Sequence, residues 1–467
     1  MISIFVNRKE ELKILEKEWE KKNSFVVVYG RRRVGKTELI KQFLKDKRGI
    51  TYTAEETSKT IQIREFKNQI ASFLNDEFLM TQEFKEWKPL FSYLQKVLDP
   101  NKKFYIWIDE FPYLMKTSPE LPSVLQQFID DFLRKSNIFF IISGSLFGII
   151  REKVLSSSSP LYGRRTRDIL LLPLKFNFVK EFLNWRLEDR FKLYFTIGGI
   201  PEYLLLARNY KDYTSFIESE FLNKNGHFYR EPHFLLSREF KEIKTYFSIL
   251  TAISLGNTTP TQIANFVGIK TREIYPYLDN LISYGFVGRM EFLFKKKSVY
   301  FVKDPFFDFW FNFVYRNRTQ IELGIKELNK EVLNTYFGKR FEIFVYENLP
   351  IIFPRLKKLT KHIKTYKKNN KGLQIEIDIV ALNEKIKEIL FAECKWKSRV
   401  NAEKVVEELA EKARYVDWFK DKRKESYAVF AKSFSKRIKE FEGKKVYCFD
   451  LRELEKSLKN KNLTKSP

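Results

Sequence analysis

The segment GRRRVGKT (30–37) most constrains what this chain can fold into. It fits the pattern G-x-x-x-x-G-K-[ST], and it lies between a short apolar run (25–30) and a stretch with helical periodicity (37–45). In that setting, glycines let the main chain wrap around phosphate oxygens at the start of a helix. A basic glycine turn without a ligand is the alternative. The strand, loop and helix together predict a phosphate-binding loop.

The chemistry of such a loop predicts ATP and Mg²⁺ as ligands. Lys36 would reach the β- and γ-phosphates, and the Thr37 hydroxyl would coordinate the Mg²⁺. The candidate nucleotide-binding residues here are Gly30, Arg33, Val34, Gly35, Lys36, Thr37 and Glu38.

The run FYIWIDE (104–110) ends in two adjacent carboxylates, Asp109 and Glu110. Carboxylates directly after a buried strand are costly unless a cation or ligand pairs with them. Asp109 would hold the Mg²⁺ through water, and Glu110 would act as the general base on the attacking water. The alternative is an acidic strand end that faces solvent.

Five β-rich apolar runs (25–30, 50–55, 104–110, 138–144 and 168–174) alternate with helical stretches. This order predicts a parallel sheet covered on both faces. Ser143 and Ser145, at the end of the fourth run, either sense the γ-phosphate or form an ordinary turn. Arg164 and Arg165 follow a serine-rich loop, and either could act as an arginine finger or belong to a basic turn.

Composition narrows the class of protein and of partner. The chain has 467 residues, a net charge of +27 and two cysteines, which exclude a disulfide scaffold. The excess charge indicates either a nucleic-acid partner or a lysine-rich surface like that of thermophile proteins. The apolar uncharged run 136–150 is too short to span a membrane, and the N-terminus does not resemble a signal peptide. We therefore expect a soluble cytoplasmic protein without a membrane partner.

Six motifs in order resemble the archaeal ATPase family, in the STAND-like branch of the AAA+ P-loop ATPases. They are FVNRKEEL, GRRRVGKTEL, IDEFPYL, ISGS, PLYGRRTRDI and GGIPEYL, between about Ile4 and Leu204. The resemblance implies ATP hydrolysis, with Arg8 near the adenine side and Pro201 in a lid motif on the nucleotide. Such sites often need a neighbour's arginine, so the resemblance leaves open a homo-oligomer and a finger acting in cis or in trans.

Residues 259–302 are typical of a winged helix-turn-helix. We expect a first helix at 261–266, a turn at Gly268, a recognition helix at 270–283 and a wing at 286–302. Pro276 falls inside that recognition helix, where a kink is tolerable but unfavourable. The buried stripe would be Ile263, Ile274, Leu278 and Leu281, and the residues facing phosphates would be Lys270, Arg272, Lys295, Lys296 and Lys297. Contact with DNA is favoured over a protein-binding or interdomain role.

Two alternating runs in the C-terminal part, QIEIDIVAL (374–382) and FAECKWK (391–397), predict adjacent strands. They would bring Asp378, Glu393 and Lys395 together, and a preceding helix offers Glu342. Two carboxylates that bind Mg²⁺ and a lysine that polarises the nucleophile suit phosphodiester cleavage.

The spacing D-x(14)-E-x-K is that of the PD-(D/E)XK nuclease family, and the archaeal ATPase family often carries such a C-terminal domain. The predicted roles are therefore metal binding by Asp378, Glu393 and Glu342, and catalysis by Glu393 and Lys395. A nuclease-like fold that only binds DNA and an ordinary charged hairpin are the alternatives. The lysine-rich stretch 357–372 would hold a nucleic-acid backbone or form a solvated loop.

The predicted fold is α/β with four parts: a P-loop ATPase core (1–174), a helical lid (175–238), a winged helix with connector (239–325) and a restriction-endonuclease-like domain (326–467). The predicted function is ATP hydrolysis coupled to DNA binding, with a metal-dependent nuclease activity left uncertain. The competing hypothesis is a nucleotide-switched DNA-binding or regulatory scaffold protein without C-terminal catalysis.

Overall fold

The computed structural model describes residues 5–292, 298–325, 327–368 and 371–459, with no account of the side chains of 362–374. Contacts divide the chain into two units, one of residues 1–174 with Ile200–Tyr203 and one of Lys175–Gly199 with Leu204–Pro467. Each unit is described by itself below. The fold class is α/β, as the sequence predicts.

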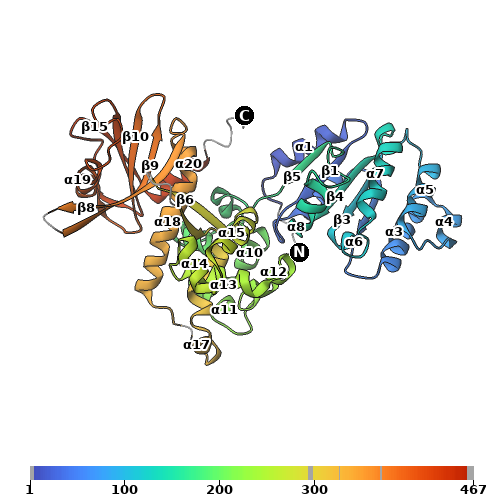
Figure 1. Cartoon of the computed structure of the whole chain (residues 1–467), viewed down its shortest axis with the longest axis horizontal. Helices are drawn as coiled ribbons and strands as arrows, with labels where there is room; N and C mark the ends of the chain where they lie inside the picture. Colours follow the sequence, from blue (N-terminus) through green and yellow to red (C-terminus); the bar gives the residue numbers. More distant parts are fainter. Residues whose placement is uncertain (1–4, 293–297, 326, 369–370, 460–467) are drawn as a thin grey trace. The chain divides into compact units, whose positions relative to one another are not determined.

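The first unit is built on a five-stranded parallel sheet in the order β2-β3-β4-β1-β5. Helices lie on both of its sides (Figure 1). The strands are β1 (Phe25–Tyr29), β2 (Gly49–Thr53), β3 (Tyr105–Asp109), β4 (Phe139–Gly144) and β5 (Arg167–Leu170). The helices are α1 (Lys9–Trp19), α2 (Lys36–Leu44), α3 (Lys59–Leu74), α4 (Glu77–Thr81), α5 (Trp87–Val97), α6 (Pro112–Thr117), α7 (Leu121–Asp131) and α8 (Phe147–Ile150).

The order of strands sets the geometry of the first site. β1 and β4 are buried throughout because helices cover both faces of a parallel sheet. β4 lies between β1 and β3, so its carboxyl end stands between the ends of the other two. The segments that follow β1, β3 and β4 therefore meet at one edge of the sheet.

The second unit begins with helices and ends with a mixed sheet. The helices before the sheet are α9 (Leu187–Ile197), α10 (Pro201–Ala207, which begins in the first unit), α11 (Tyr213–Glu220), α12 (Glu231–Glu239), α13 (Ile243–Ser254), α14 (Pro260–Val267), α15 (Ile274–Ser283), α16 (Pro305–Phe309), α17 (Arg318–Glu322) and α18 (Lys330–Ile352). A hairpin of β6 (Val287–Glu291) and β7 (Ser298–Val302) follows α15.

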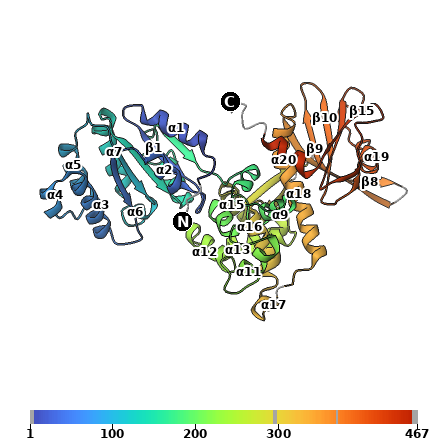
Figure 2. The ribbon, with the colours of Figure 1, turned by 180° about the vertical axis from the view of Figure 1, so that it is seen from behind.

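The C-terminal sheet has the order β14-β15-β12-β10-β9-β8. Its strands are β8 (Lys358–Lys368), β9 (Lys371–Asn383), β10 (Glu388–Lys395), β12 (Lys424–Ala431), β14 (Glu440–Phe441) and β15 (Lys444–Phe449). α19 (Ala402–Ala413) packs on one face, and α18 and α20 (Leu451–Lys459) lie on the other (Figure 2). Ile377, Phe391, Val406 and Tyr427 are among the core residues between the sheet and α19.

Strand β8 is an element that the sequence analysis does not predict. Its residues 358–368 include five lysines, and lysine is depleted in strands. Pairing with β9 nevertheless holds this segment in the sheet as an edge strand. Edge strands in natural proteins often carry lysines, because charge there opposes pairing with another chain.

Candidate functional site

The phosphate loop follows β1 and leads into α2. Gly30 has φ 148°, and a Cβ atom there would lie 2.4 Å from the Leu171 carbonyl oxygen, so only glycine fits. Gly35, with φ 91°, is the residue before the first turn of α2. The Lys36 ammonium donates to the carbonyl oxygens of Gly30 (2.9 Å) and Arg31 (3.0 Å), which places a cation inside the loop.

Asp109 is 3% exposed at the end of β3, and protein groups hold both of its oxygens. Thr37 Oγ1 donates to Oδ2 (2.9 Å), and Ser143 Oγ donates to Oδ1 (2.6 Å). The Trp107 indole in turn donates to Ser143 Oγ (2.7 Å). These bonds bring Thr37 and Asp109, the two predicted magnesium-binding residues of this site, into direct contact.

Glu110 has a left-handed backbone, with φ 51°. Its Oε2 accepts hydrogen bonds from both the main-chain N–H (3.0 Å) and the hydroxyl (2.8 Å) of Ser145. Ser143 and Ser145 therefore contact the two acidic residues, Asp109 and Glu110 respectively. The sequence offered a turn or a γ-phosphate sensor for the serines, and their role in sensing stays a prediction.

Of two further predicted residues, Arg8 contacts the loop and Pro201 precedes two residues that do. Arg8 is buried and donates through Nη2 to the carbonyl oxygens of Val34 and Leu172 (both 2.9 Å), and burial lowers its pKa. Pro201 begins α10, and the next two residues contact Arg33: its guanidinium pairs with Glu202 (3.0 Å) and lies over the Tyr203 ring. Glu38 is exposed on the first turn of α2 and makes no described contact with the loop.

The structure does not bring Arg164 or Arg165 to the phosphate loop of the same chain. The Thr166 N–H donates to the Phe25 carbonyl at the start of β1, so both arginines precede the amino-terminal edge of the sheet. Arg164 donates through Nε and Nη2 to Asp130 (2.9 and 2.7 Å), and Arg165 donates to Asp168 (3.1 Å). The sequence leaves a finger in cis or in trans open; these positions do not support a finger in cis, and a finger in trans stays a prediction.

The C-terminal carboxylates converge at β9 and β10. The Cys394 N–H donates to Asp378 Oδ2 (2.9 Å), which places Asp378 beside the neighbouring strand. Glu393 is 5% exposed, and its Oε1 accepts from Lys395 (2.9 Å) and Lys412 (3.2 Å). Glu393 Oε2 is buried without a hydrogen-bond partner among the described residues.

The electrostatics of this cluster favour a cation. Burial, with the nearby charges of Glu393 and Glu342, raises the pKa of Asp378 to about 7. Burial also raises the pKa of Glu342, which Lys361 opposes from 2.7 Å. A divalent ion beside Asp378 and Glu393 would relieve both effects and would give Oε2 a partner.

The predicted metal set is only partly assembled. Within the part of the chain that the structure describes, no three His, Cys, Asp or Glu side chains are close enough to share one metal ion. Asp378 and Glu393 remain as a two-carboxylate pair, whereas Glu342 is ion-paired with Lys361. The sequence analysis missed three contact residues here: Lys361, Glu376 and Lys412. Glu376 lies two residues before Asp378 in the alternating run 374–382, so the alternation could have found it.

Residues 260–283 form the predicted helix, turn and helix, but the second helix begins later than predicted. Gly268 has φ 81° after α14, and the stripe of Ile263, Ile274, Leu278 and Leu281 is buried. The second helix begins at Ile274, not at Lys270, because residues 271–273 form a 3₁₀ turn. Pro276 therefore falls in the first helical turn, where its missing N–H has no helical acceptor to lose.

The exposed charges of residues 270–283, which include the 3₁₀ turn and the second helix, are balanced. Lys270 and Arg272 are exposed, but so are Glu273 and Asp279. Lys295, Lys296 and Lys297, which were expected to extend the basic surface, lie outside the described residues.

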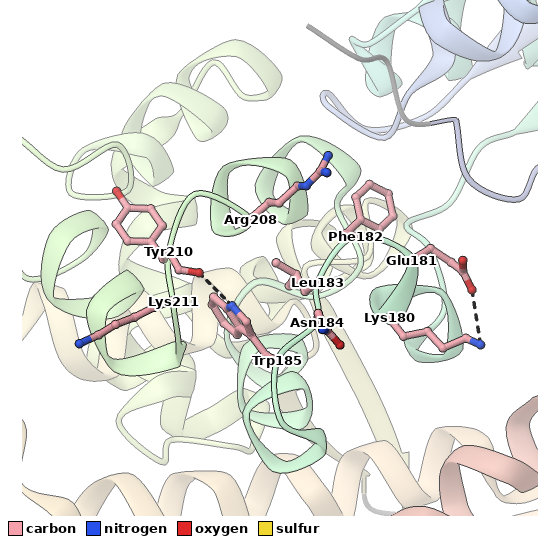
Figure 3. A pocket seen from close by; sticks show the side chains of 9 residues that line it. All are labelled: Lys180, Glu181, Phe182, Leu183, Asn184, Trp185, Arg208, Tyr210 and Lys211. Atoms are coloured by element: carbon pink, nitrogen blue, oxygen red, sulfur yellow. Dashed lines mark hydrogen bonds and ion pairs between the residues drawn. The ribbon is translucent and has the colours of Figure 1, made fainter.

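A cavity of about 460 Å³ lies among residues 180–211 of the second unit (Figure 3). Lys180 pairs with Glu181, and the Trp185 indole donates to the Tyr210 carbonyl oxygen (3.0 Å). Figure 3 shows Lys180, Arg208 and Lys211 extending from different sides of the cavity rather than toward one point. None of its lining residues is a predicted site residue, and we assign no ligand to it.

Across the described ranges, no helix is long and apolar enough to cross a bilayer.

Known proteins resemble this chain in both halves. A model of an ATPase domain found predominantly in Archaea matches residues 5–207, and a model of archaeal and bacterial proteins of unknown function (DUF234) matches residues 310–406. MJECL04, an uncharacterized protein of Methanocaldococcus jannaschii, is 33% identical over 459 residues, covering 96% of this chain and 99% of that protein. The uncharacterized ATP-binding protein MJ0423 of the same organism is 60% identical over 48 residues, covering 10% of this chain and 81% of that protein.

Two solved structures are also similar. The Walker-type ATPase PABY2304 of Pyrococcus abyssi has 21% identity and a TM-score of 0.48, covering 66% of this chain and 96% of that one. The ORC2 protein of Aeropyrum pernix has 13% identity and a TM-score of 0.39, covering 69% of this chain and 98% of that one. The match along nearly the whole of MJECL04, with the ATPase domain, shows that the chain belongs to the archaeal ATPase family and is an ATP-hydrolysing enzyme.

Proposed function

We propose that this ATPase acts on DNA and that its C-terminal domain cleaves phosphodiester bonds with a divalent metal ion. The observation that carries the proposal is the pair Asp378 and Glu393: a half-buried acid and a buried acid on adjacent strands, with Glu393 Oε2 unpartnered among the described residues. A buried carboxylate oxygen without a donor is unfavourable unless a ligand completes it.

The roles of the residues follow from their chemistry. Asp378 and Glu393 would hold the ion, which would supply Lewis acidity at a phosphate oxygen. Lys395, whose ammonium is 2.9 Å from Glu393, would orient the attacking water and offset the charge that develops on the phosphate. Magnesium at the ATP site would be held by Thr37 and Asp109, with Glu110 as the general base.

DNA binding is supported by charge. The net charge is +27, and β8 lies at the edge of the sheet that carries the carboxylates. Residues 243–302 would form a winged helix and a second contact with DNA. A homo-oligomer that presents Arg164 or Arg165 to a neighbour's nucleotide belongs to the same proposal.

A second candidate function is a nucleotide-switched DNA-binding or regulatory protein whose C-terminal fold is not catalytic. Specific contacts favour it: Lys395 and Lys412 both pair with Glu393, and Lys361 pairs with Glu342. Lysines that neutralise the carboxylates would also suit a site that no longer binds metal. The balanced charge around α15 equally suits a winged helix that contacts protein.

Cleavage of labelled single- and double-stranded DNA with Mg²⁺ or Mn²⁺, with and without ATP, separates the two candidates. We expect wild-type cleavage and its loss in Glu393→Ala, with ATP hydrolysis retained. Glu388→Ala, at the other end of the same strand, is the matched control and should cleave normally. DNA binding without cleavage by the wild type would favour the switched-binding protein, and binding that persists at high salt would argue against lysine contacts to phosphates.

A further inference from the structure

A lysine lies among the carboxylates of the C-terminal domain. The Lys361 ammonium is 2.7 Å from Glu342 Oε1 and 2.8 Å from Glu376 Oε1. The Lys361 side chain is 14% exposed. Three elements, β8, α18 and β9, therefore supply one closed ion triad.

A β-bulge positions this lysine. Thr360 lies opposite Val380, but position 362 lies opposite Ile377, so two residues of β9, Asp378 and Ile379, oppose Lys361 alone. Bulges re-aim side chains at functional sites. Glu376 and Asp378 share one face of β9 because they are two residues apart. Lys361 therefore lies beside Asp378 on the face that carries the acids.

The charges of the cluster set how many metal ions it can take. Four carboxylates (Glu342, Glu376, Asp378 and Glu393) stand against three ammonium groups (Lys361, Lys395 and Lys412), which leaves a net charge of −1. One divalent ion and one phosphodiester would bring the total to zero. A second divalent ion would leave the filled site at +2 and would have to displace Lys361 from Glu342.

We propose that Lys361 is a built-in cation that takes the place of a second metal ion, so that the site binds one divalent ion, held by Asp378 and Glu393. The inference rests on the proposed function, because it specifies the metal content of that same site. Lys361 acts through Glu342 and Glu376, which makes it a positioning residue. Its removal frees two carboxylates for a second ion.

Counting bound Mn²⁺ tests this directly. Electron paramagnetic resonance of the full-length, nucleotide-free protein would be titrated with Mn²⁺, in an Asp109→Asn background that removes the nucleotide-site carboxylate. We expect one tightly bound ion per chain, lost in Glu393→Ala. In Lys361→Met we expect two ions, and in Lys361→Arg, which keeps the charge, one ion again.

The controls separate the inference from the proposed function. Lys358→Met, on the same strand but with a lysine 57% exposed, should bind one ion as the wild type does. Two ions in the wild type, or one ion in a folded Lys361→Met protein, would overturn the role of Lys361 while leaving a metal-dependent nuclease intact. No bound ion in the wild type would overturn both. If Lys361→Met does not fold, the wild-type count still decides, because two bound ions would overturn the role of Lys361.

Discussion

The nucleotide site and the C-terminal carboxylate cluster differ in the groups that donate hydrogen bonds to their buried acids. Asp109 receives neutral donors, the hydroxyls of Thr37 and Ser143, on its two oxygens. Glu393 instead accepts from two lysines on one oxygen, and the other oxygen has no partner among the residues that the structure describes. Hydroxyl donors can satisfy the hydrogen-bonding capacity of a buried acid without adding charge. Lysines add positive charge on one oxygen and leave the other oxygen without a donor. Neutral protein groups thus organise the first site, whereas the second leaves one buried carboxylate oxygen for the proposed cation.

The comparison implies that a substitution in one site should leave the activity of the other site unchanged. The largest loss of activity should come from a substitution in the phosphate loop. Lys36→Ala removes the cation that the loop holds at Gly30 and Arg31, and should slow ATP hydrolysis by about 1,000-fold or more. Phosphate release measures it. Lys41→Ala, an exposed lysine on the same helix, should hydrolyse ATP normally. Loss of metal-dependent DNA cleavage in Lys36→Ala without ATP would break the separation of the sites.

The second prediction concerns Glu110, the proposed general base of the nucleotide site. Glu110→Gln keeps a side chain that can bond with Ser145 but removes the basic oxygen, so hydrolysis should fall by about 100-fold while ATP still binds. Binding of a fluorescent ATP analogue and single-turnover hydrolysis would separate the two effects. Turnover at the wild-type rate would show that Glu110 does not take the proton.

The smallest effect concerns stability and pH at the second site. The pKa of Asp378 is raised from an ordinary value of 3.8 to about 7, so the folded chain holds a proton that the unfolded chain releases. This contribution to stability is complete below about pH 4 and is lost as pH rises through about 7. Asp378→Asn should therefore exceed the wild type by about 2 kcal/mol in urea unfolding at pH 8, with the difference vanishing near pH 4.

The effect of magnesium on stability provides a second test of the same prediction. At pH 8, without nucleotide, Mg²⁺ should stabilise the wild type but not Asp378→Asn, because only the ionised acid binds it. Asp417→Asn, an exposed acid on the segment after α19, should match the wild type in every condition. An Asp378→Asn protein less stable than the wild type at pH 8 would show that the carboxylate is satisfied without a cation.

Much of both sites could be predicted from spacing. The pattern of Gly30, Lys36 and Thr37 between a strand and a helix, and the alternation that pairs Glu393 with Lys395, depend on local periodicity. The structure brings Thr37 to Asp109, and Asp378 to the main chain beside Glu393. Local patterns of this kind report on which face or loop a residue occupies.

What could not be predicted depended on long-range pairing. Strand β8 is too rich in lysine to indicate a strand, and only its pairing with β9 explains it. Lys361 contacts Glu342, and Lys412 contacts Glu393, each from another element of secondary structure that is 19 residues away in sequence. The distance of Arg164 from the phosphate loop follows from the parallel register of β5 against β1, which no single motif encodes.

The hydrogen bond from the Trp107 indole also connects a fluorescent side chain to the nucleotide site. Trp107 donates to Ser143, which donates to Asp109, and Asp109 accepts from Thr37. Any ligand that draws on the Thr37 hydroxyl or the Asp109 carboxylate alters the polarity at the end of this chain of bonds. Because the indole is 2% exposed, solvent does not mask the change. Trp107 is one of seven tryptophans in the chain, and its share of the emission is the part that should change when ATP arrives.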